Sequence, residues 1–164
     1  MLVYHQAYDS YHCIFRMLQI LSWIGEKKLE LDRIRIYDYY LLFPQELKNA
    51  SLPKAYQKIK RTQPQSRYNK VFNPNQIYYH LESFQISALQ TLASYNLIEK
   101  QQFQKNIILR STMPIPNGLK GLIDKNINLE IHKLLIEYFE TIPIKELKKR
   151  TKFIEYKYEL STNQ

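Results

Sequence analysis

Apolar residues recur at three- and four-residue spacing over residues 10–24, which is the period of one face of an α-helix. Asp9 or Ser10 can cap the start of this helix, and Gly25 can adopt the left-handed conformation that ends it. The apolar stripe consists of Cys13, Ile14, Met17, Leu18, Leu21 and Ile24. The pattern therefore predicts an amphipathic helix that packs on the core.

A second helix is predicted to begin near Asp32 and to run to Leu42. Its β-branched and aromatic residues are also compatible with a strand, so the periodicity alone leaves both forms open. Pro44 ends the element, because the residue before a proline avoids the helical region of backbone space. Pro44 can then open a short helix that continues to Lys48.

The middle of the chain predicts a helix over 74–82, a break at 83–85, a helix over 86–97 and a strand over 106–110. With 31–42 as the first helix, this order matches a helix-turn-helix followed by a wing. We expect an α+β fold that is mostly helical and winged-helix-like, with a small β element. The second helix of the pair carries no Arg or Lys, so we expect it to pack rather than to read DNA bases.

Length and composition limit the organisation of the chain. With 164 residues, 45 % of them hydrophobic and 24 % charged, it should fold as one domain with a core. The expected parts of that domain, 1–164, are an N-terminal helix 10–24, a winged-helix-like region at about 31–112 with a basic insertion 48–70, and a C-terminal helical region 127–160.

Several function classes are disfavoured by what the sequence contains. Only three glycines occur and the phosphate-loop pattern G-x-x-x-x-G-K-[ST] is missing, so no nucleotide-hydrolysing site is expected. A single cysteine allows neither an internal disulfide nor a cysteine-based zinc site. The first residues do not resemble a signal peptide, and no apolar run approaches the roughly 20 residues of a membrane span. We therefore expect a cytoplasmic protein without a membrane partner.

Positive charge is concentrated in one segment. The formal net charge is +9, and residues 48–70 contain seven basic residues and no acidic one. Because Pro53 and Pro64 interrupt it, the segment is predicted to be a loop or short helix that stands off the core. We expect its cations to contact nucleic-acid phosphates, with Tyr56 and Tyr68 available for stacking. The predicted phosphate-binding residues are Lys54, Lys58, Lys60, Arg61 and Arg67.

Two alternatives remain open for the basic residues. The segment 48–70 is equally compatible with a loop that water solvates and no ligand contacts. A second cluster spans residues 145–152, where cations commonly complement the dipole at the end of a helix. That cluster could also bind an anionic partner.

The residues give no support for catalysis or for a bound metal or cofactor. The four histidines, His5, His12, His80 and His132, do not form a metal-binding pair, and Cys13 lies on the apolar stripe of its helix. Asp32 and Asp38 have arginine and tyrosine neighbours, which a buried polar network explains without chemistry. We expect no enzyme activity, no metal and no cofactor.

Tyrosine is abundant, at 14 residues, and it gathers around the two N-terminal helices. Tyrosine joins apolar area to a hydrogen-bonding hydroxyl and is enriched at protein interfaces. A helix with tyrosine on every side has more faces than a small core is expected to cover. We therefore predict contacts with a partner protein, and the residues assigned to them are Tyr11, Tyr37, Asp38, Tyr40 and Phe43.

Two stretches carry a resemblance to a known family. Residues 8–16 (YDSYHCIFR) and 31–44 (LDRIRIYDYYLLFP) resemble the middle component of ABC-three-component bacterial defence systems, of which the Lamassu anti-phage systems are members. The similarity continues through residues 89–110, and covers about two thirds of the chain. None of these stretches is a catalytic signature.

The resemblance implies a function beyond what the residues establish. Such a protein would be a winged-helix-like accessory subunit that bridges the heads of an SMC/Rad50-like ATPase and an effector nuclease, with DNA close to the complex. The alternative that the residues leave open is a free-standing winged-helix transcriptional regulator, which would be a homodimer that selects one operator.

Overall fold

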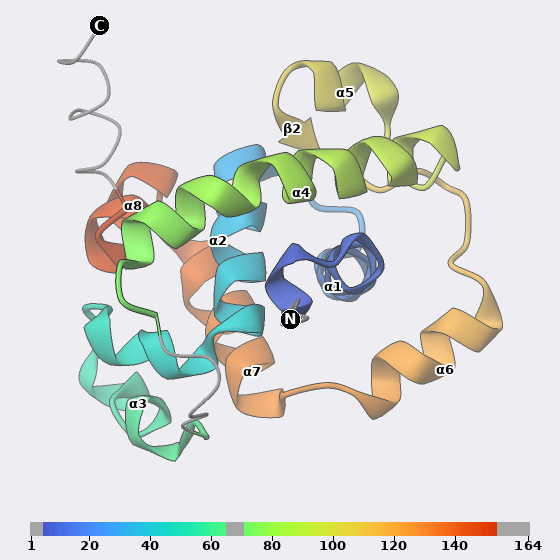
Figure 1. Ribbon diagram of the computed structural model, residues 1–164. Helices are drawn as coiled ribbons and strands as arrows, with labels where there is room; N and C mark the ends of the chain where they lie inside the picture. Colours follow the sequence, from blue (N-terminus) through green and yellow to red (C-terminus); the bar gives the residue numbers. More distant parts are fainter. Residues whose placement is uncertain (1–4, 65–70, 154–164) are drawn as a thin grey trace, which may run out of the picture.

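The computed structural model describes residues 5–64 and 71–153. Within these ranges the chain is mostly helical, as predicted (Figure 1). The helices are α1 (Ser10–Ile24), α2 (Leu31–Leu42), α3 (Ile59–Thr62), α4 (Pro74–Ser94), α5 (Lys100–Gln104), α6 (Asn117–Lys125), α7 (Leu129–Glu137) and α8 (Ile144–Thr151). The 3-10 helices are Gln6–Tyr8, Pro44–Asn49, Lys54–Tyr56 and Phe139–Thr141, and the strands are β1 (Leu29–Glu30) and β2 (Ile107–Ile108).

Helix α1 begins and ends where the sequence predicts. The Asp9 carboxylate accepts hydrogen bonds from the backbone N–H groups of Tyr11 and His12, at 2.8 and 3.2 Å. These bonds satisfy donors that have no partner inside the helix. Gly25 takes φ of 60° at the other end, a conformation with little cost only for glycine.

Helix α2 lies at the centre of the fold, with α1, α4, α7 and α8 around it (Figure 1). This position explains why its apolar and aromatic residues are spread around the whole helix, a pattern typical of buried helices. Its tyrosines Tyr37, Tyr39 and Tyr40 are each at most 1 % exposed. The helical alternative for this stretch is the correct one.

The break predicted at residues 83–85 is wrong. Helix α4 is continuous over Pro74–Ser94, starting at the Asn73 cap as predicted. No glycine or proline interrupts it, and its buried stripe continues through the expected break. That stripe includes Leu81, Gln85, Ala88, Leu89 and Leu92. The predicted pair of helices 74–82 and 86–97 is therefore one helix that packs along α1 and α2.

The β structure is a small antiparallel sheet. Leu29 pairs with Ile108 and Glu30 with Ile107. Beyond β2, Arg110 forms an isolated antiparallel bridge with Ile98, which follows α4. The predicted strand over 106–110 is present in this shortened form. No helix among the described residues has both the length and the hydropathy that a membrane crossing requires.

The basic segment does not stand off the core as predicted. Between residues 48 and 64, Leu52 and Ile59 are buried, at 6 % and 9 % exposure. The Gln63 amide donates to Glu130 Oε2 at 2.9 Å and accepts from Asn128 Nδ2 at 3.0 Å. These contacts attach the segment to the start of α7. The prediction overlooked the apolar positions between the cations; residues 65–70 lie outside the described ranges.

Candidate interaction surfaces

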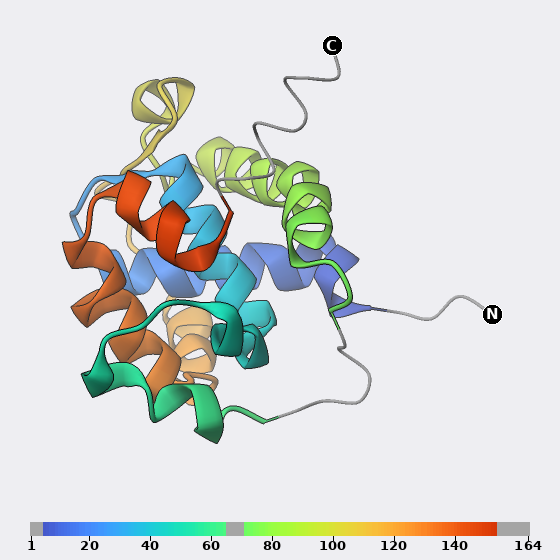
Figure 2. The ribbon, with the colours of Figure 1, turned by 90° about the vertical axis from the view of Figure 1, so that its left-hand side faces the viewer.

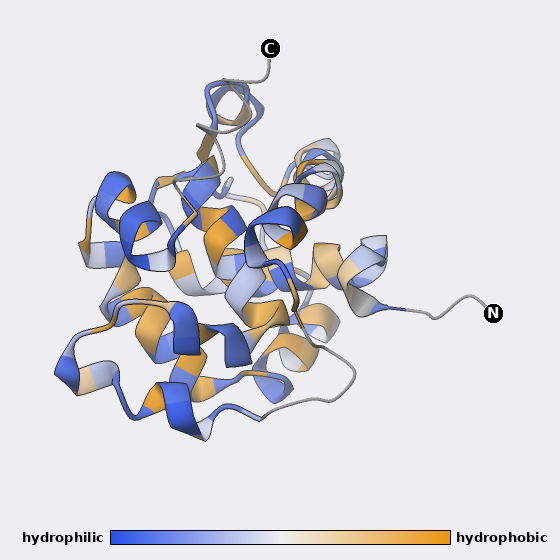
Figure 3. Cartoon of the chain, turned by 60° about the vertical axis from the view of Figure 1, so that its left-hand side comes forward, coloured by the Kyte–Doolittle hydropathy of each residue, from blue (hydrophilic) through white to orange (hydrophobic). Residues whose placement is uncertain are grey.

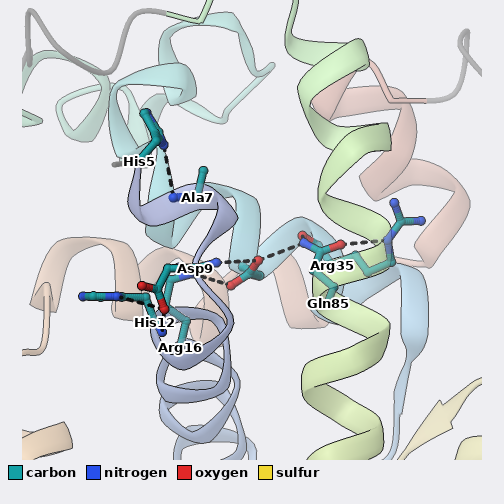
Figure 4. Close-up of polar contacts among 8 residues, drawn as sticks. His5, Ala7, Asp9, His12, Arg16, Arg35 and Gln85 are labelled. Carbon is teal, nitrogen blue, oxygen red and sulfur yellow. Dashed lines mark hydrogen bonds and ion pairs between the residues drawn. The ribbon is translucent and has the colours of Figure 1, made fainter. Parts of the chain in front are cut away.

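A buried polar network joins α1, α2 and α4 (Figure 4). Arg16 Nε donates to Asp38 Oδ1 at 2.6 Å, and Gln85 Nε2 donates to Asp38 Oδ2 at 2.9 Å. On its other side, the Gln85 amide oxygen accepts from Arg35 Nε at 2.9 Å. Arg35 also lies over the Tyr78 ring, 4.4 Å from its centroid. The network ties three helices together, as the buried-network interpretation of Asp38 predicts.

Four of the five residues predicted to contact a partner lie inside the chain's own core. Tyr37 and Asp38 are 0 % exposed, Tyr40 is 1 % exposed and Phe43 is 3 % exposed. The reason given for that prediction is wrong, because the other helices cover every side of α2. In this structure these four residues present no surface to a partner. Tyr11, at 84 % exposure, is the member of the set that does.

Tyr11 belongs to an exposed aromatic area at the start of α1. Tyr8, in the preceding 3-10 helix, is 43 % exposed, and its ring lies 5.6 Å from the ring of Phe84 on α4. We call Tyr8, Tyr11 and Phe84 the N-terminal aromatic surface. Exposed aromatic side chains are favourable anchors for protein partners.

Further along α4, an open groove of about 520 Å³ is lined by residues that include Tyr79, Ser83, Ile86 and Gln90. No Arg or Lys contributes to its lining. The outward face of α4 that lines this groove therefore presents none of the cations that commonly read DNA bases.

Cys13 and His132, two of the residues considered for catalysis or metal binding, pack against other parts of the fold. Cys13 is 0 % exposed, and burial together with the neighbouring Asp38 carboxylate raises the pKa of its thiol to about 12. A thiol with that pKa is a poor nucleophile at neutral pH. The His132 ring lies 4.6 Å from the Trp23 ring, where burial lowers its pKa. Among the described residues, no group of three or more His, Cys, Asp and Glu is placed to hold a metal ion.

The predicted phosphate-binding residues fall into three groups. Lys54, Lys58 and Arg61 are exposed. Lys60 is half-buried, and its ammonium group donates a hydrogen bond to the Ala50 carbonyl oxygen. Arg67 lies outside the described residues. The structure thus separates three solvent-facing cations from one that is tied to the chain's own backbone.

One face of the half-buried Tyr56 ring is covered by another ring of the chain. Tyr56 stacks on Tyr138, with ring centroids 5.2 Å apart and planes 25° apart. This contact fixes the basic segment to the end of α7. The stacking predicted for Tyr56 stays a prediction, and Tyr68 lies outside the described residues.

The second basic cluster, on α8, contacts the basic segment at Ser51. Ser51 N–H donates to the Arg150 carbonyl oxygen at 2.8 Å. Arg150 Nη1 in turn reaches the Ser51 carbonyl oxygen at 3.5 Å, across 99 positions of sequence. Figure 2 shows α8 and the segment with the 3-10 helix Lys54–Tyr56 and α3 on the same side of the molecule. Nothing in the sequence signals this contact, because it depends on how α8 packs on α2.

Comparison with models of protein families gives a match that covers nearly the whole chain. The family model described as ABC-three component (ABC-3C) system Middle Component 5 matches residues 2–159. Neither the curated proteins nor the solved structures yield a match.

Proposed function

The chain belongs to the ABC-three component system Middle Component 5 family, and from this premise we propose that it is a non-catalytic accessory subunit that bridges an ATPase and an effector. In this proposal the ATPase is SMC/Rad50-like, the effector is a nuclease, and the system is a Lamassu-type anti-phage defence. The single observation that carries the proposal is the family match across residues 2–159.

An accessory subunit needs surfaces for partners, and the N-terminal aromatic surface is our first candidate. Tyr11 is 84 % exposed although tyrosine commonly buries most of its ring area. Covering such a ring in an interface removes apolar area from water and leaves the hydroxyl free to bond at the rim. We assign this surface to one of the two protein partners.

The absence of catalysis is part of the proposal. It is supported by the positions of the groups that could react. Cys13 and Asp38 are both 0 % exposed, so a substrate in solution does not reach them. Asp38 also accepts hydrogen bonds from Arg16 and Gln85, which commits it to holding the helices together.

The proposal also includes a winged-helix-like fold, with different helices from those that the sequence predicted. β2 and Arg110 lie in one stretch that pairs with β1 on one side and with Ile98 on the other. In this proposal the two-stranded sheet, extended by that one bridge, is the counterpart of a wing. Since α4 is continuous, the helix pair would consist of α2 and α4, with the basic segment inserted between them.

The test is to purify the tagged chain from its native host and to identify the captured proteins by mass. Recovery of a large ATPase and a second protein in fixed ratio supports the proposal. Recovery of the chain alone as a dimer that selects one DNA sequence would favour the transcriptional regulator instead. A DNA contact near the ATPase, made by Lys54, Lys58 and Arg61, is the further part of the proposal and is developed next.

A further inference from the structure

Helix α8 carries two exposed lysines on one face, and a third exposed lysine caps its C-terminal end. Lys145 and Lys149 follow the spacing i, i+4, which places their side chains in one row along the helix, and Lys152 is the C-cap that follows them. Leu147 and Thr151 are buried on the opposite side. The helix dipole favours Lys149 and Lys152, which lie at the C-terminal end of α8. It does not favour Lys145, which lies in the first turn, where a positive charge is unfavourable.

The basic segment carries a second row of cations. Lys54, Lys58 and Arg61 follow the spacing i, i+4, i+7, and all three are exposed. The row is regular in space because Gln57 and Lys58, which join the 3-10 helix to α3, both have right-handed helical backbone angles. Residues 54–62 thus form a nearly continuous helical stretch, with Ile59 buried beneath it.

The two rows belong to one side of the molecule. The backbone hydrogen bond from Ser51 to Arg150, at 2.8 Å, joins the chain just before the first row to the last turn of α8. In Figure 1 both elements lie on the left, and in Figure 2 both face the viewer. Figure 3 shows hydrophilic residues on the outer sides of both.

No ion pair among the described residues neutralises the positive charge of these rows. The carboxylates nearby bind other groups. Asp32 pairs with Lys148 and Glu146 with Arg150, while Glu130 accepts from Thr62 and Gln63. Six exposed cations that have no acidic partner in residues 5–64 and 71–153 favour a polyanion as the ligand.

The side chains between the cations indicate which kind of polyanion this surface suits: a single strand, a membrane or a duplex. Binding of single strands relies on exposed aromatic rings, and membrane insertion relies on exposed apolar side chains. The large hydrophobic residues that are exposed in the described ranges all lie outside residues 48–62 and outside α8. Among the described residues of this segment, Tyr56 stacks one face of its ring on Tyr138. A surface of cations without exposed aromatic residues suits the phosphates of a duplex.

We propose that the two rows, Lys54–Lys58–Arg61 and Lys145–Lys149–Lys152, form one surface that binds the backbone of double-stranded DNA without sequence preference. This inference rests on the DNA contact of the proposed function and extends it to α8. The surface is assembled from two segments about 90 residues apart, which only the fold brings together.

The experiment measures the affinity of the full chain for a labelled mixed-sequence duplex of about 20 base pairs over a range of salt concentrations. One variant, K145Q/K149Q/K152N, removes the α8 row. Asparagine is chosen at position 152 because φ is 63° there, which asparagine tolerates. The second variant, K54Q/K58Q/R61Q, removes the other row. The matched control, K100Q/K105Q/K120Q, removes the same number of positive charges. Its lysines lie in α5, at the C-terminal end of α5 and in α6, and Figure 1 shows these helices on the other side of the molecule.

If both rows contact phosphates, each row variant lowers the slope of log affinity against log salt by about 2 to 3, since each lost contact contributes about 0.9. Affinity at about 0.1 M salt then falls at least tenfold, and the control changes the slope by less than about 1. Equal effects of the control and the α8 variant would overturn the inference, because the charge would then act diffusely. Tighter binding to a single strand of the same length, or to phosphatidylserine vesicles, would overturn it as well.

The outcomes also separate this inference from the proposed function. If K54Q/K58Q/R61Q flattens the salt dependence and the α8 variant does not, the role of α8 is wrong and the simpler DNA contact stands. If neither variant changes the salt dependence of the affinity, the proposed DNA contact itself is wrong. Capture of the ATPase and the effector by the wild-type chain tests the accessory-subunit proposal independently of DNA.

Discussion

Arg16 on α1 and Asp38 on α2 form a buried ion pair, with Arg16 Nε 2.6 Å from Asp38 Oδ1. The side chain of Asp38 is 0 % exposed and that of Arg16 is 9 % exposed. Arg16 Nη2 makes a second, longer bond to Oδ2 at 3.3 Å, and Gln85 donates to the same oxygen. The pair therefore has the additional hydrogen bonds that a buried charge requires.

We predict that replacing one partner of this pair destabilises the protein strongly. Asp38→Ala leaves the Arg16 guanidinium buried without its counter-charge, which costs about 3–5 kcal/mol. The measurement is the free energy of unfolding from urea titration. Lys27→Ala is the control, because its ion pair with Glu140 involves a lysine side chain that is 61 % exposed. The control should lose no more than about 1 kcal/mol. Equal losses in the two variants would contradict the structural role of Asp38.

Gln85 provides the second prediction, because its amide links Asp38 to Arg35. Gln85→Leu fills a similar volume but leaves the Arg35 Nε donor and an oxygen of Asp38 without this partner. The expected loss is about 1–3 kcal/mol in the free energy of unfolding. Gln90→Leu, on the exposed outer face of the same helix, is the matched control and should change stability by less than about 0.5 kcal/mol. Equal stability of Q85L and the wild type would mean that the network does not hold α4.

The third prediction concerns alkaline pH. Burial raises the pKa values of Tyr37, Tyr39, Tyr40 and Tyr78 above their usual 10.0, and raises that of Cys13 from 9.0 to about 12. The folded state therefore keeps protons that the unfolded state loses. Stability is fully present below about pH 9 and falls as the pH rises above 9 to 10. Each group contributes up to about 1.4 kcal/mol per pH unit. Tyrosinate absorbance should rise together with unfolding as the buried rings are released.

A variant at Tyr39 tests this explanation. The Tyr39 hydroxyl is buried and has no hydrogen-bond partner among the described residues. Tyr39→Phe removes that hydroxyl, so at neutral pH it should leave stability unchanged or raise it by about 1 kcal/mol. Above pH 10 its stability should fall less steeply than that of the wild type. Tyr95→Phe, at a 68 % exposed ring, should not alter the slope. A steeper fall in Y39F would show that the hydroxyl has another role.

Local sequence signals predicted helix α1 well. The Asp9 cap, the Gly25 end and the apolar stripe place α1 correctly, because each depends on neighbouring residues only. The prediction failed at residues 83–85, where polar residues suggested a turn. Gln85 is a buried polar residue whose side chain hydrogen-bonds to Asp38 and Arg35. In the sequence alone, where these partners are unknown, a polar residue in a buried network looks the same as a polar residue in a turn.

The candidate surfaces were less predictable for a similar reason. The tyrosines of α2 suggested an interface, but the chain's own helices cover them, which periodicity does not reveal. The residues of the two basic rows were each visible in the sequence. Their proximity was not, since it is set by the contact between Ser51 and Arg150. Spacing indicates which residues share a helix face, whereas packing decides which faces meet.

The last prediction concerns Tyr11, whose ring the chain leaves 84 % exposed. Tyr11→Ser should change the free energy of unfolding by less than about 0.5 kcal/mol, because the ring makes little contact within the fold. If the N-terminal aromatic surface binds a partner, the same change should cost about 1–2 kcal/mol of binding and lower capture of that partner about tenfold. Tyr95→Ser, at the end of α4, is the matched control and should capture both partners normally. Since neither variant affects folding, reduced capture by Y11S alone would locate the interface at α1. Normal capture by both would exclude Tyr11 from it and leave the exposed groove of α4 as the next surface to test.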